Sequence, residues 1–211
     1  MKIDEIREEY TRGSLRRSDL TEEPMGLFSV WLEQAVEARV DEPTAMVVST
    51  SGLDGFPQSR VVLLKSFDRE GFLFFTGYNS QKGKAIARDP KVALLFFWPG
   101  MQRQIRVTGM ATKVTPEMSA DYFRTRPLNS RLGAWASPQS EVIPSRSTLE
   151  ERFREVTRRF GEGEVPCPGH WGGYRVTPLT MEFWQGRANR LHDRFIYTLI
   201  DGEWNIARLA P

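Results

Sequence analysis

The sequence predicts an α+β fold in which an antiparallel β-barrel is accompanied by helices. Seven or eight segments have the alternation or the β-branched and aromatic content of strands, and most are joined by short turn signals such as Asp54-Gly55. The helical segments do not alternate regularly with these strands, which argues against a doubly wound parallel sheet. Neither GxGxxG nor GxxxxGKS/T occurs, so side chains must do much of any phosphate binding.

The first half of the chain fits one amphipathic helix followed by strands. Residues 2–10 fit a short polar helix or an arm, whereas 22–40 fit a helix because pairs of apolar residues recur every four positions. Pro24 suits the first turn of that helix. From residue 44 the hydrophobic period changes to that of strands. We expect strands over 44–51, 58–67, 72–77, 91–98 and 103–114.

Three further helices and three further strands are expected. The segments 80–90 and 116–126 fit helices, and Pro127 stops the second of them. A capping box from Ser147 to Glu150 opens a third helix, which runs amphipathically to the next glycine. The remaining expected strands cover 173–186, 190–202 and 203–209.

Length and composition limit the classes of protein. A chain of 211 residues can bury a large core without a disulfide or a metal, and we expect one domain over 21–211 after an arm over 1–20. The single cysteine, Cys167, allows no internal disulfide and suits a reducing compartment. The amino terminus lacks the apolar core of a signal peptide, and the longest apolar run, 92–98, is far too short for a membrane helix. We therefore expect a cytoplasmic protein that has no membrane partner.

Basic residues at two places are candidates for binding anions. Arg60 and Lys65 bracket the apolar run of an expected strand, and Lys82 and Lys84 lie near the start of an expected helix, where amide groups also attract anions. The plain alternative is a core strand with solvated basic ends and a solvated helix face. In the functional alternative, the strand backbone lies against a flat ligand while its two ends bind anions.

A third cluster combines a phenol, a guanidinium and a hydroxyl. Tyr122 and Arg126 are four residues apart on one helix face, and Ser130 follows just past Pro127. Because arginine offers a forked pair of donors, these groups could bind a phosphate, although a solvated surface pair has the same spacing. Together the clusters suggest two phosphates with flat rings between them. Arg60 and Lys82 would hold the first phosphate, and Lys65, Tyr122, Arg126 and Ser130 the second.

The segment 190–194 places one of the two histidines between two arginines. If this stretch is extended, Arg190, His192 and Arg194 point to one face. Flanking arginines lower the pKa of an imidazole and favour its neutral form, which suits a polar anionic ligand, whereas a lone histidine is more often structural. The other histidine, His170, has no carboxylate or cysteine partner at ligand spacing, so we expect no metal site.

With these residues in place, the chain resembles the pyridoxine/pyridoxamine 5′-phosphate oxidases, the flavin enzymes of vitamin B6 metabolism. The resemblance runs from about Arg7 to Pro211 and rests on several motifs in the same order. The motifs are REEYTRGSLRR, RVVLLK, RQIRVTG, HWGGYRV and, as the most specific, EFWQG followed by RLHDRF. The resemblance implies an antiparallel split β-barrel that binds FMN, has peripheral helices, and works as a homodimer with FMN at the subunit interface.

The resemblance also assigns residues to the two ligands. The implied FMN-binding residues are Arg60, Val61, Val62, Leu63, Leu64, Lys65, Phe75, Thr76, Gln81, Lys82, Gln104, Gln139, Ser140, Trp184 and Arg194. The implied substrate-binding residues are Arg7, Tyr10, Lys65, Tyr122, Arg126, Ser130, Arg190, Leu191 and His192. Arg190 and His192 would be the catalytic pair that holds the pyridine ring against the flavin, and the arm with Arg7 and Tyr10 would close over the substrate as a lid. Gln81 stands where the family commonly has arginine, which implies a weaker hold on FMN.

The implied reaction is the oxidation of pyridoxamine or pyridoxine 5′-phosphate to pyridoxal 5′-phosphate. A hydride passes from C4′ of the substrate to N5 of FMN, and O2 reoxidises the flavin to give hydrogen peroxide. One rival is a flavin reductase or carrier of the same fold, which would not require the Tyr122, Arg126 and Ser130 cluster. The other rival is a nucleic-acid-binding module. The net charge of +2, from 29 Lys and Arg against 27 Asp and Glu, and the separation of the basic clusters argue against it.

Overall fold

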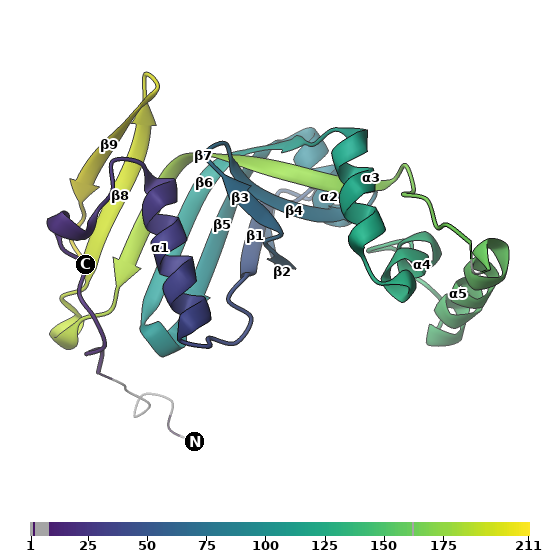
Figure 1. The fold of residues 1–211 in the computed structure, drawn as a ribbon, viewed down its shortest axis with the longest axis horizontal. Coiled ribbons are helices and arrows are strands. Elements are labelled where there is room, and N and C mark those ends of the chain that lie inside the picture. The colour runs from purple at the N-terminus through teal and green to yellow at the C-terminus, as the bar shows by residue number, and fades with distance from the viewer. Residues whose placement is uncertain (1, 3–8, 162) are drawn as a thin grey trace.

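The computed structural model describes residues 2, 9–161 and 163–211, which form a curled antiparallel sheet with helices on one face and at one end (Figure 1). The nine strands are β1 (Ala45–Ser51), β2 (Pro57–Leu63), β3 (Ser66–Asp68), β4 (Gly71–Gly77), β5 (Lys91–Trp98), β6 (Arg103–Lys113), β7 (Trp171–Gln185), β8 (Asp193–Ile200) and β9 (Glu203–Arg208). The α-helices are α1 (Pro24–Glu37), α2 (Gln81–Arg88), α3 (Pro116–Thr125), α4 (Leu128–Ala136) and α5 (Arg146–Phe160). The expected α+β class with an antiparallel sheet is confirmed.

The sheet is curled because its long strands pair with different neighbouring strands at their two ends. The strand order is β2-β1-β5-β6-β7-β4-β3, and β8 and β9 extend from β7. The first part of β7 pairs with β4 and its last part pairs with β8, so β7 runs from one end of the molecule to the other. The curl brings the end of β2 toward β4, where the amide of Lys65 donates a 2.8 Å hydrogen bond to the carbonyl of Leu73. The sheet thus forms a half-barrel.

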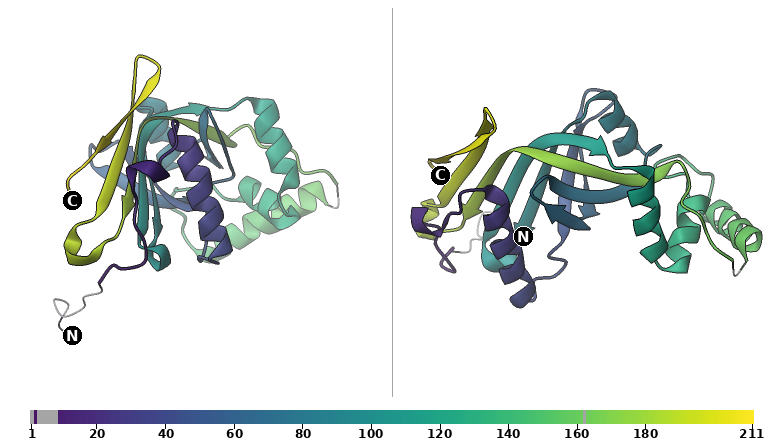
Figure 2. Two further views of the ribbon diagram at one scale, coloured as in Figure 1. Left: turned by 60° about the vertical axis from the view of Figure 1, so that its left-hand side comes forward. Right: turned by 45° about the horizontal axis from the view of Figure 1, so that its top comes forward.

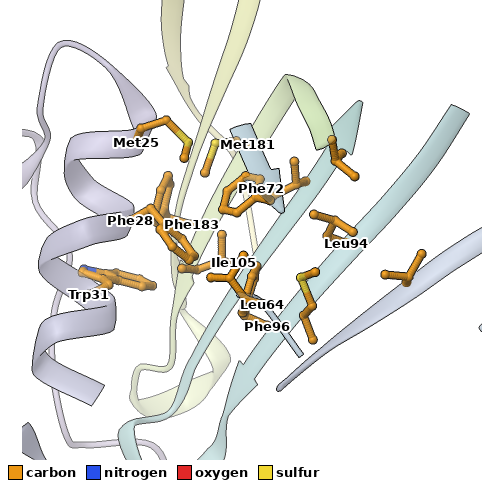
Figure 3. Close-up of a cluster of buried hydrophobic side chains, with 14 of the residues drawn as sticks. Met25, Phe28, Trp31, Leu64, Phe72, Leu94, Phe96, Ile105, Met181 and Phe183 are labelled. Carbon is orange, nitrogen blue, oxygen red and sulfur yellow. The ribbon is translucent and has the colours of Figure 1, made fainter. Parts of the chain in front are cut away.

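Helix α1 covers the concave face of this half-barrel and closes the main core (Figure 3). The ring of Phe28 is fully buried and meets the rings of Phe72 and Phe96 edge-on, at centroid distances of 4.9 and 5.0 Å. Trp31, one turn further along α1, meets Phe183 of β7 at 5.3 Å. Burying such large rings stabilises the fold by about 2–3 kcal/mol for each ring. The helix expected over 22–40 is therefore present, and its apolar face is the one the periodicity indicated.

Two features at the helix boundaries correct the sequence predictions. Pro127 ends α3 as expected, but it also occupies the N-cap position of α4, a helix that was not expected. Proline is compatible with a helix start because its missing N–H has no partner there. Helix α5 begins earlier than expected, since the Ser145 side chain, not that of Ser147, accepts the cap hydrogen bond from the amide of Thr148 at 3.2 Å.

The two ends of the molecule carry different segments (Figure 2). At one end the segment before α1 lies beside β8 and β9, and at the other end α3, α4 and α5 surround the start of β7. A second, smaller core lies under these three helices and contains Phe123, Leu132, Val165 and Trp171. In the described part of the chain, no helix is both long and apolar enough to cross a membrane.

Candidate functional site

Four residues singled out in the sequence line one pocket of about 470 Å³ at the helical end of the molecule. Lys65 follows β2, Tyr122 comes from α3, Arg126 follows α3, and Ser130 lies in the first turn of α4. We call these four residues the cationic clamp. The short link at Pro127 explains the convergence, because it turns α4 back so that Ser130 faces the same space as Arg126.

Arg126 is held in place by ring contacts and keeps a free donor. Its guanidinium carbon lies 4.7 Å from the centre of the Trp171 ring and 5.5 Å from that of Phe123. Its Nη1 atom is buried and has no hydrogen-bond partner. Burial lowers the pKa of Arg126 below its usual range, although the guanidinium remains charged at neutral pH. A desolvated cation with an unused donor favours an anionic ligand.

Tyr122 belongs to a stack of parallel rings that forms one wall of this pocket. Its ring lies 3.9 Å from that of Phe75 with an interplanar angle of 17°, and Phe75 lies 5.4 Å from Trp171 at 14°. Burial raises the pKa of Tyr122, more than the nearby Arg126 lowers it. The phenol therefore keeps its proton and can donate it to an anion.

A second pocket of about 370 Å³ contains Arg60 and Lys82. Lys82 is buried, and burial followed by the charge of Arg60 lowers its pKa from 10.5. Its Nζ donates a 3.2 Å hydrogen bond to Oγ1 of Thr76, and Nη1 of Arg60 donates one of 2.9 Å to Oγ1 of Thr50. Within residues 9–161 and 163–211, no carboxylate is ion-paired with Arg60, Lys82 or Arg126. Two cations with only neutral partners favour an anionic ligand in this pocket.

The two pockets are neighbours. Thr76 and Gln139 line the pocket of the cationic clamp, while Ser140, the next residue, lines the pocket of Arg60 and Lys82. Oε1 of Gln139 accepts hydrogen bonds from Oγ1 of Thr76 at 3.1 Å and from the amide of Gly77 at 2.9 Å, which ties the 139–140 turn to β4. Two anion sites side by side suit a pair of phosphorylated ligands. Gln81 lines the second pocket without adding a charge.

The segment 190–194 differs from the expected strand. Residues Ala188–Arg190 form a short 3-10 turn, and β8 begins only at Asp193. The reason is that Asn189 and Arg190 have φ angles of +56° and +59°, in the left-handed region that no strand can pass through. The prediction that Arg190, His192 and Arg194 line one face of a single strand is therefore wrong. Only Arg194 is a strand residue, and His192 precedes the strand.

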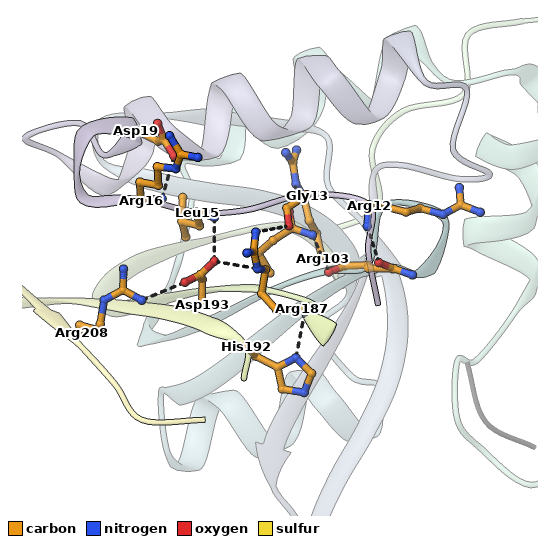
Figure 4. A network of polar contacts seen from close by, with 12 residues as sticks. Arg12, Gly13, Leu15, Arg16, Asp19, Arg103, Arg187, His192, Asp193 and Arg208 are labelled. Atoms are coloured by element: carbon orange, nitrogen blue, oxygen red, sulfur yellow. Dashed lines mark hydrogen bonds and ion pairs between the residues drawn. The ribbon is translucent and has the colours of Figure 1, made fainter. Parts of the chain in front are cut away.

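His192 is nevertheless fixed in orientation (Figure 4). The amide of Arg187 donates a 3.1 Å hydrogen bond to Nδ1 of His192, and the imidazole lies 4.6 Å from the Trp184 ring and 5.8 Å from that of Tyr10. Burial, followed by the charges of Arg190 and Arg194, lowers the pKa of His192 from 6.5. The expected influence of the two arginines is thus confirmed in direction. With Nδ1 as an acceptor, the neutral ring carries its proton on Nε2.

Three residues predicted to bind the cofactor form a row across the sheet. Gln104 of β6 pairs with Trp184 of β7, which in turn pairs with Arg194 of β8. Cross-strand partners point to the same face, and these lie on the face opposite α1, since the neighbouring Phe183 and Phe195 are buried in the main core. The row presents an indole flanked by an amide and a guanidinium.

Within a single chain, the candidate residues form two separate groups near the two ends of β7. The pocket of the cationic clamp lies at the start of β7, which contributes Trp171, and the row with Trp184 lies near the other end of this 15-residue strand. Tyr10 and His192 lie with the second group, Leu191 is exposed beside it, and Arg7 lies outside the described residues. Among the residues described, no three His, Cys, Asp or Glu side chains gather as a metal site would require.

The remaining predicted cofactor residues follow the strand β2 and its end. Arg60 and Val62 point toward the core side of the sheet, while Val61 and Leu63 are exposed on the other face and Leu64 is buried. Trp171 was not identified from the sequence as a site residue, although it supports both Arg126 and the ring stack. The HWGGYRV motif was the available signal, since an aromatic residue beside two glycines at a strand start is unusual.

The half-barrel and its paired anion pockets define a split-barrel flavoprotein. A Nostoc punctiforme protein described as pyridoxamine 5′-phosphate oxidase-related and FMN-binding has a TM-score of 0.71 over 91% of this chain and 100% of that chain, at 16% identity, which shows the fold alone. PhzG from Burkholderia lata, solved in complex with tetrahydrophenazine-1-carboxylic acid, has a TM-score of 0.88 and 30% identity over 93% of this chain and 98% of that chain.

The chain belongs to the pyridoxamine 5′-phosphate oxidase family. The family model described as Pyridoxamine 5′-phosphate oxidase matches residues 32–160, and one described as Pyridoxine 5′-phosphate oxidase C-terminal dimerisation region matches 171–211. The pyridoxine/pyridoxamine 5′-phosphate oxidase of Crocosphaera subtropica is 52% identical over 214 residues and that of Vibrio vulnificus 47% over 211 residues, each covering 100% of both chains. The family expected from the motifs is confirmed.

Proposed function

We propose that the protein is an FMN-dependent oxidase that converts pyridoxamine and pyridoxine 5′-phosphate to pyridoxal 5′-phosphate. The observation that carries this proposal is the cationic clamp, in which Arg126 has a buried, unpartnered Nη1, beside a second pocket with its own two cations. Two phosphorylated ligands in contact require two such pockets. Full-length relatives named for this activity, at 52% and 47% identity, support the same assignment.

The residues present fit FMN. In the proposed complex, Arg60 and Lys82 would hold its phosphate together with Ser140, and β2 would line the ring system. Bound FMN would supply the hydride-accepting chemistry for oxidation of the substrate, with O2 as the final electron acceptor and hydrogen peroxide as its product. Thr76 and Gln139, which bridge the two pockets, hold the turn that separates the two ligands.

The site requires a second copy of the chain. Gln104, Trp184 and Arg194 belong to the proposed FMN site, but none of them lines the pocket of Arg60 and Lys82, so in this proposal a partner subunit supplies them. The sheet face opposite α1 provides the contact, since Val61, Leu63 and Phe97 are exposed on it. The match of residues 171–211 to a dimerisation region also supports a homodimer with FMN at its interface.

The substrate would be bound at both of its ends. In this proposal the cationic clamp of one subunit holds the phosphate, and Arg190 and His192 of the other hold the pyridine ring against FMN. His192 donates from Nε2 to an oxygen on the ring, because its Nδ1 is occupied by the amide of Arg187. Leu191 adds apolar contact. Tyr10, from the arm predicted over residues 1–20 beside the domain of residues 21–211, lies 5.7 Å from Trp184 and would help to exclude water, while Arg7 lies outside the described residues.

A purified sample tests this proposal directly. We expect a yellow protein that releases hydrogen peroxide and pyridoxal 5′-phosphate on addition of pyridoxamine 5′-phosphate. A colourless protein that does not take up FMN would contradict the cofactor, and a yellow protein that yields no peroxide with either substrate would favour a reductase or carrier. The PhzG structure has a carboxylic acid as its bound ligand. A clamp of a lysine, an arginine and two hydroxyls favours the phosphate ester for this chain.

A further inference from the structure

A buried carboxylate beside the row of Gln104, Trp184 and Arg194 has no role in the reaction proposed above. Glu182 lies on β7 two residues before Trp184, so both point to the same face of the sheet. Only 6% of Glu182 is exposed. A carboxylate buried to this degree must be paired, and its partners therefore indicate what it does.

The principal partner of Glu182 is Arg194. Oε1 of Glu182 lies 2.8 Å from both Nε and Nη2 of Arg194, and Oε2 accepts a 3.2 Å hydrogen bond from Nη1 of Arg106. The Arg106 side chain is 57% exposed, whereas that of Arg194 is 24% exposed. Exposed ion pairs contribute little, so the contact that restricts motion is the one between Glu182 and Arg194.

The residues that follow β9 contact the other edge of the Arg194 guanidinium. Nη1 of Arg194 donates a 2.6 Å hydrogen bond to the carbonyl of Ala210, and the amide of Leu209 donates one of 2.9 Å to the carbonyl of Arg194. Residues 209–211 thus lie along Arg194 as a short continuation of the sheet. Contacts on two edges leave the guanidinium one orientation.

We propose that Glu182 and residues 209–211 are positioning elements that hold Arg194 ready for FMN. This inference rests on the proposed function, because it takes Arg194 to contact the cofactor. An arginine that is already ordered loses less side-chain entropy when the ligand binds. Neither Glu182 nor Ala210 needs to touch FMN, since both act through Arg194.

The substitution Glu182→Gln distinguishes a positioning role of Glu182 from a simple effect of its charge on FMN affinity. FMN is an anion, so removing a nearby negative charge would by Coulomb's law strengthen its binding. Loss of the hydrogen-bonded partner of Arg194 would weaken it. We expect FMN to bind about tenfold more weakly to Glu182→Gln, and about fivefold more weakly after deletion of residues 209–211.

The measurement is a titration of FMN-free protein followed by quenching of flavin fluorescence. Glu150→Gln is the matched control, because Glu150 is a carboxylate paired with Arg146 on the exposed face of α5. Its affinity for FMN should equal that of the wild type. Each variant is also placed in an Arg194→Ala background, where a change at Glu182 should alter FMN affinity less than twofold.

The outcomes distinguish this inference from the proposed function. If the wild type binds no FMN, the proposed function and this inference fall together. If the wild type binds FMN and Glu182→Gln binds it equally or more tightly, or if its effect persists without Arg194, only the inference is overturned. Should Glu182→Gln fail to fold, the deletion of residues 209–211, with and without Arg194→Ala, provides the same comparison.

Discussion

The amide of Arg187 donates a hydrogen bond of 3.1 Å to Nδ1 of His192. An amide N–H can only donate, so Nδ1 must be an unprotonated acceptor for this contact to exist. Protonation of the imidazole would place two donors opposite each other and break the contact. The structure therefore favours neutral His192 with its proton on Nε2, in agreement with a pKa that burial, Arg190 and Arg194 lower.

The pH dependence of the reaction should reflect this lowered pKa. His192 is a base whose pKa lies below the usual 6.5, so its neutral form persists as the pH falls to 6.5 and is lost only further into acid. We expect kcat/KM for pyridoxamine 5′-phosphate to have no acid limb from His192 above pH 6.5. The check is a pH profile of the wild type against His192→Gln, which keeps a donor near Nε2 but cannot titrate. An acid limb above pH 6.5 that vanishes in His192→Gln would contradict the expectation.

Arg126→Ala should act on the substrate phosphate. Its guanidinium carries the free buried Nη1 in the clamp pocket, so its loss should raise KM for pyridoxamine 5′-phosphate about 100-fold. Steady-state kinetics with and without the phosphate group provide the measurement. Pyridoxamine itself, which has nothing for Arg126 to bind, should react equally slowly with wild type and variant.

A neighbouring arginine gives the control for Arg126. Arg124 lies in the last turn of α3, two residues before Arg126, but it is exposed and paired with Asp121. Arg124→Ala should therefore leave KM for the phosphorylated substrate within about twofold of the wild type. If both variants raise KM alike, the helix would be acting through its general charge and the clamp assignment would be wrong.

Gln81→Arg should strengthen FMN binding. Gln81 lines the pocket of Arg60 and Lys82, and an added cation there attracts the FMN phosphate. We expect the dissociation constant of FMN to fall roughly three- to tenfold, with a steeper dependence on salt. Fluorescence titration at two ionic strengths measures both effects. Ala87→Arg adds the same charge to an exposed position of α2 that does not line the pocket, and equal gains in the two variants would rule out a specific effect.

The sequence predicted the strands and the cationic clamp for different reasons. Most strands could be recognised because one of their faces lies in the core, as the alternating burial of β1 and β5 illustrates. The clamp could be recognised because its chemistry depends on residue type and helical spacing, as for Tyr122 and Arg126. Helix α4 was missed since Pro127 was interpreted only as a stop, although proline is equally suited to a helix start.

The turn at Asn189 and Arg190 could not be predicted from local signals. Asparagine adopts the left-handed conformation readily, but arginine does so rarely, and the alternating pattern around His192 suggested a strand. Likewise, the amino-acid composition does not show that Trp171 and Trp184 lie near opposite ends of β7. This separation follows from the pairing of β7 with β4 at its start and with β8 at its end, partners that the predicted strand over 173–186 did not reveal.

Val61→Glu should disrupt the proposed homodimer. Val61 is 66% exposed on the sheet face opposite α1, where β2 lies at the sheet edge. A carboxylate there would have to be buried without a partner when two copies associate, which is strongly unfavourable. We expect the variant to be a monomer by light scattering and to lose FMN, since Trp184 and Arg194 would no longer reach the pocket of Arg60.

Val36→Glu is the control for this substitution. Val36 is a similarly exposed valine, at 56%, but it lies on α1, on the opposite side of the sheet. Because no second copy is expected there, the variant should remain a dimer and keep its FMN. A Val61→Glu protein that is monomeric yet binds FMN as tightly as the wild type would show that one chain suffices for the cofactor. The shared site would then be wrong even though the dimer interface had been located correctly.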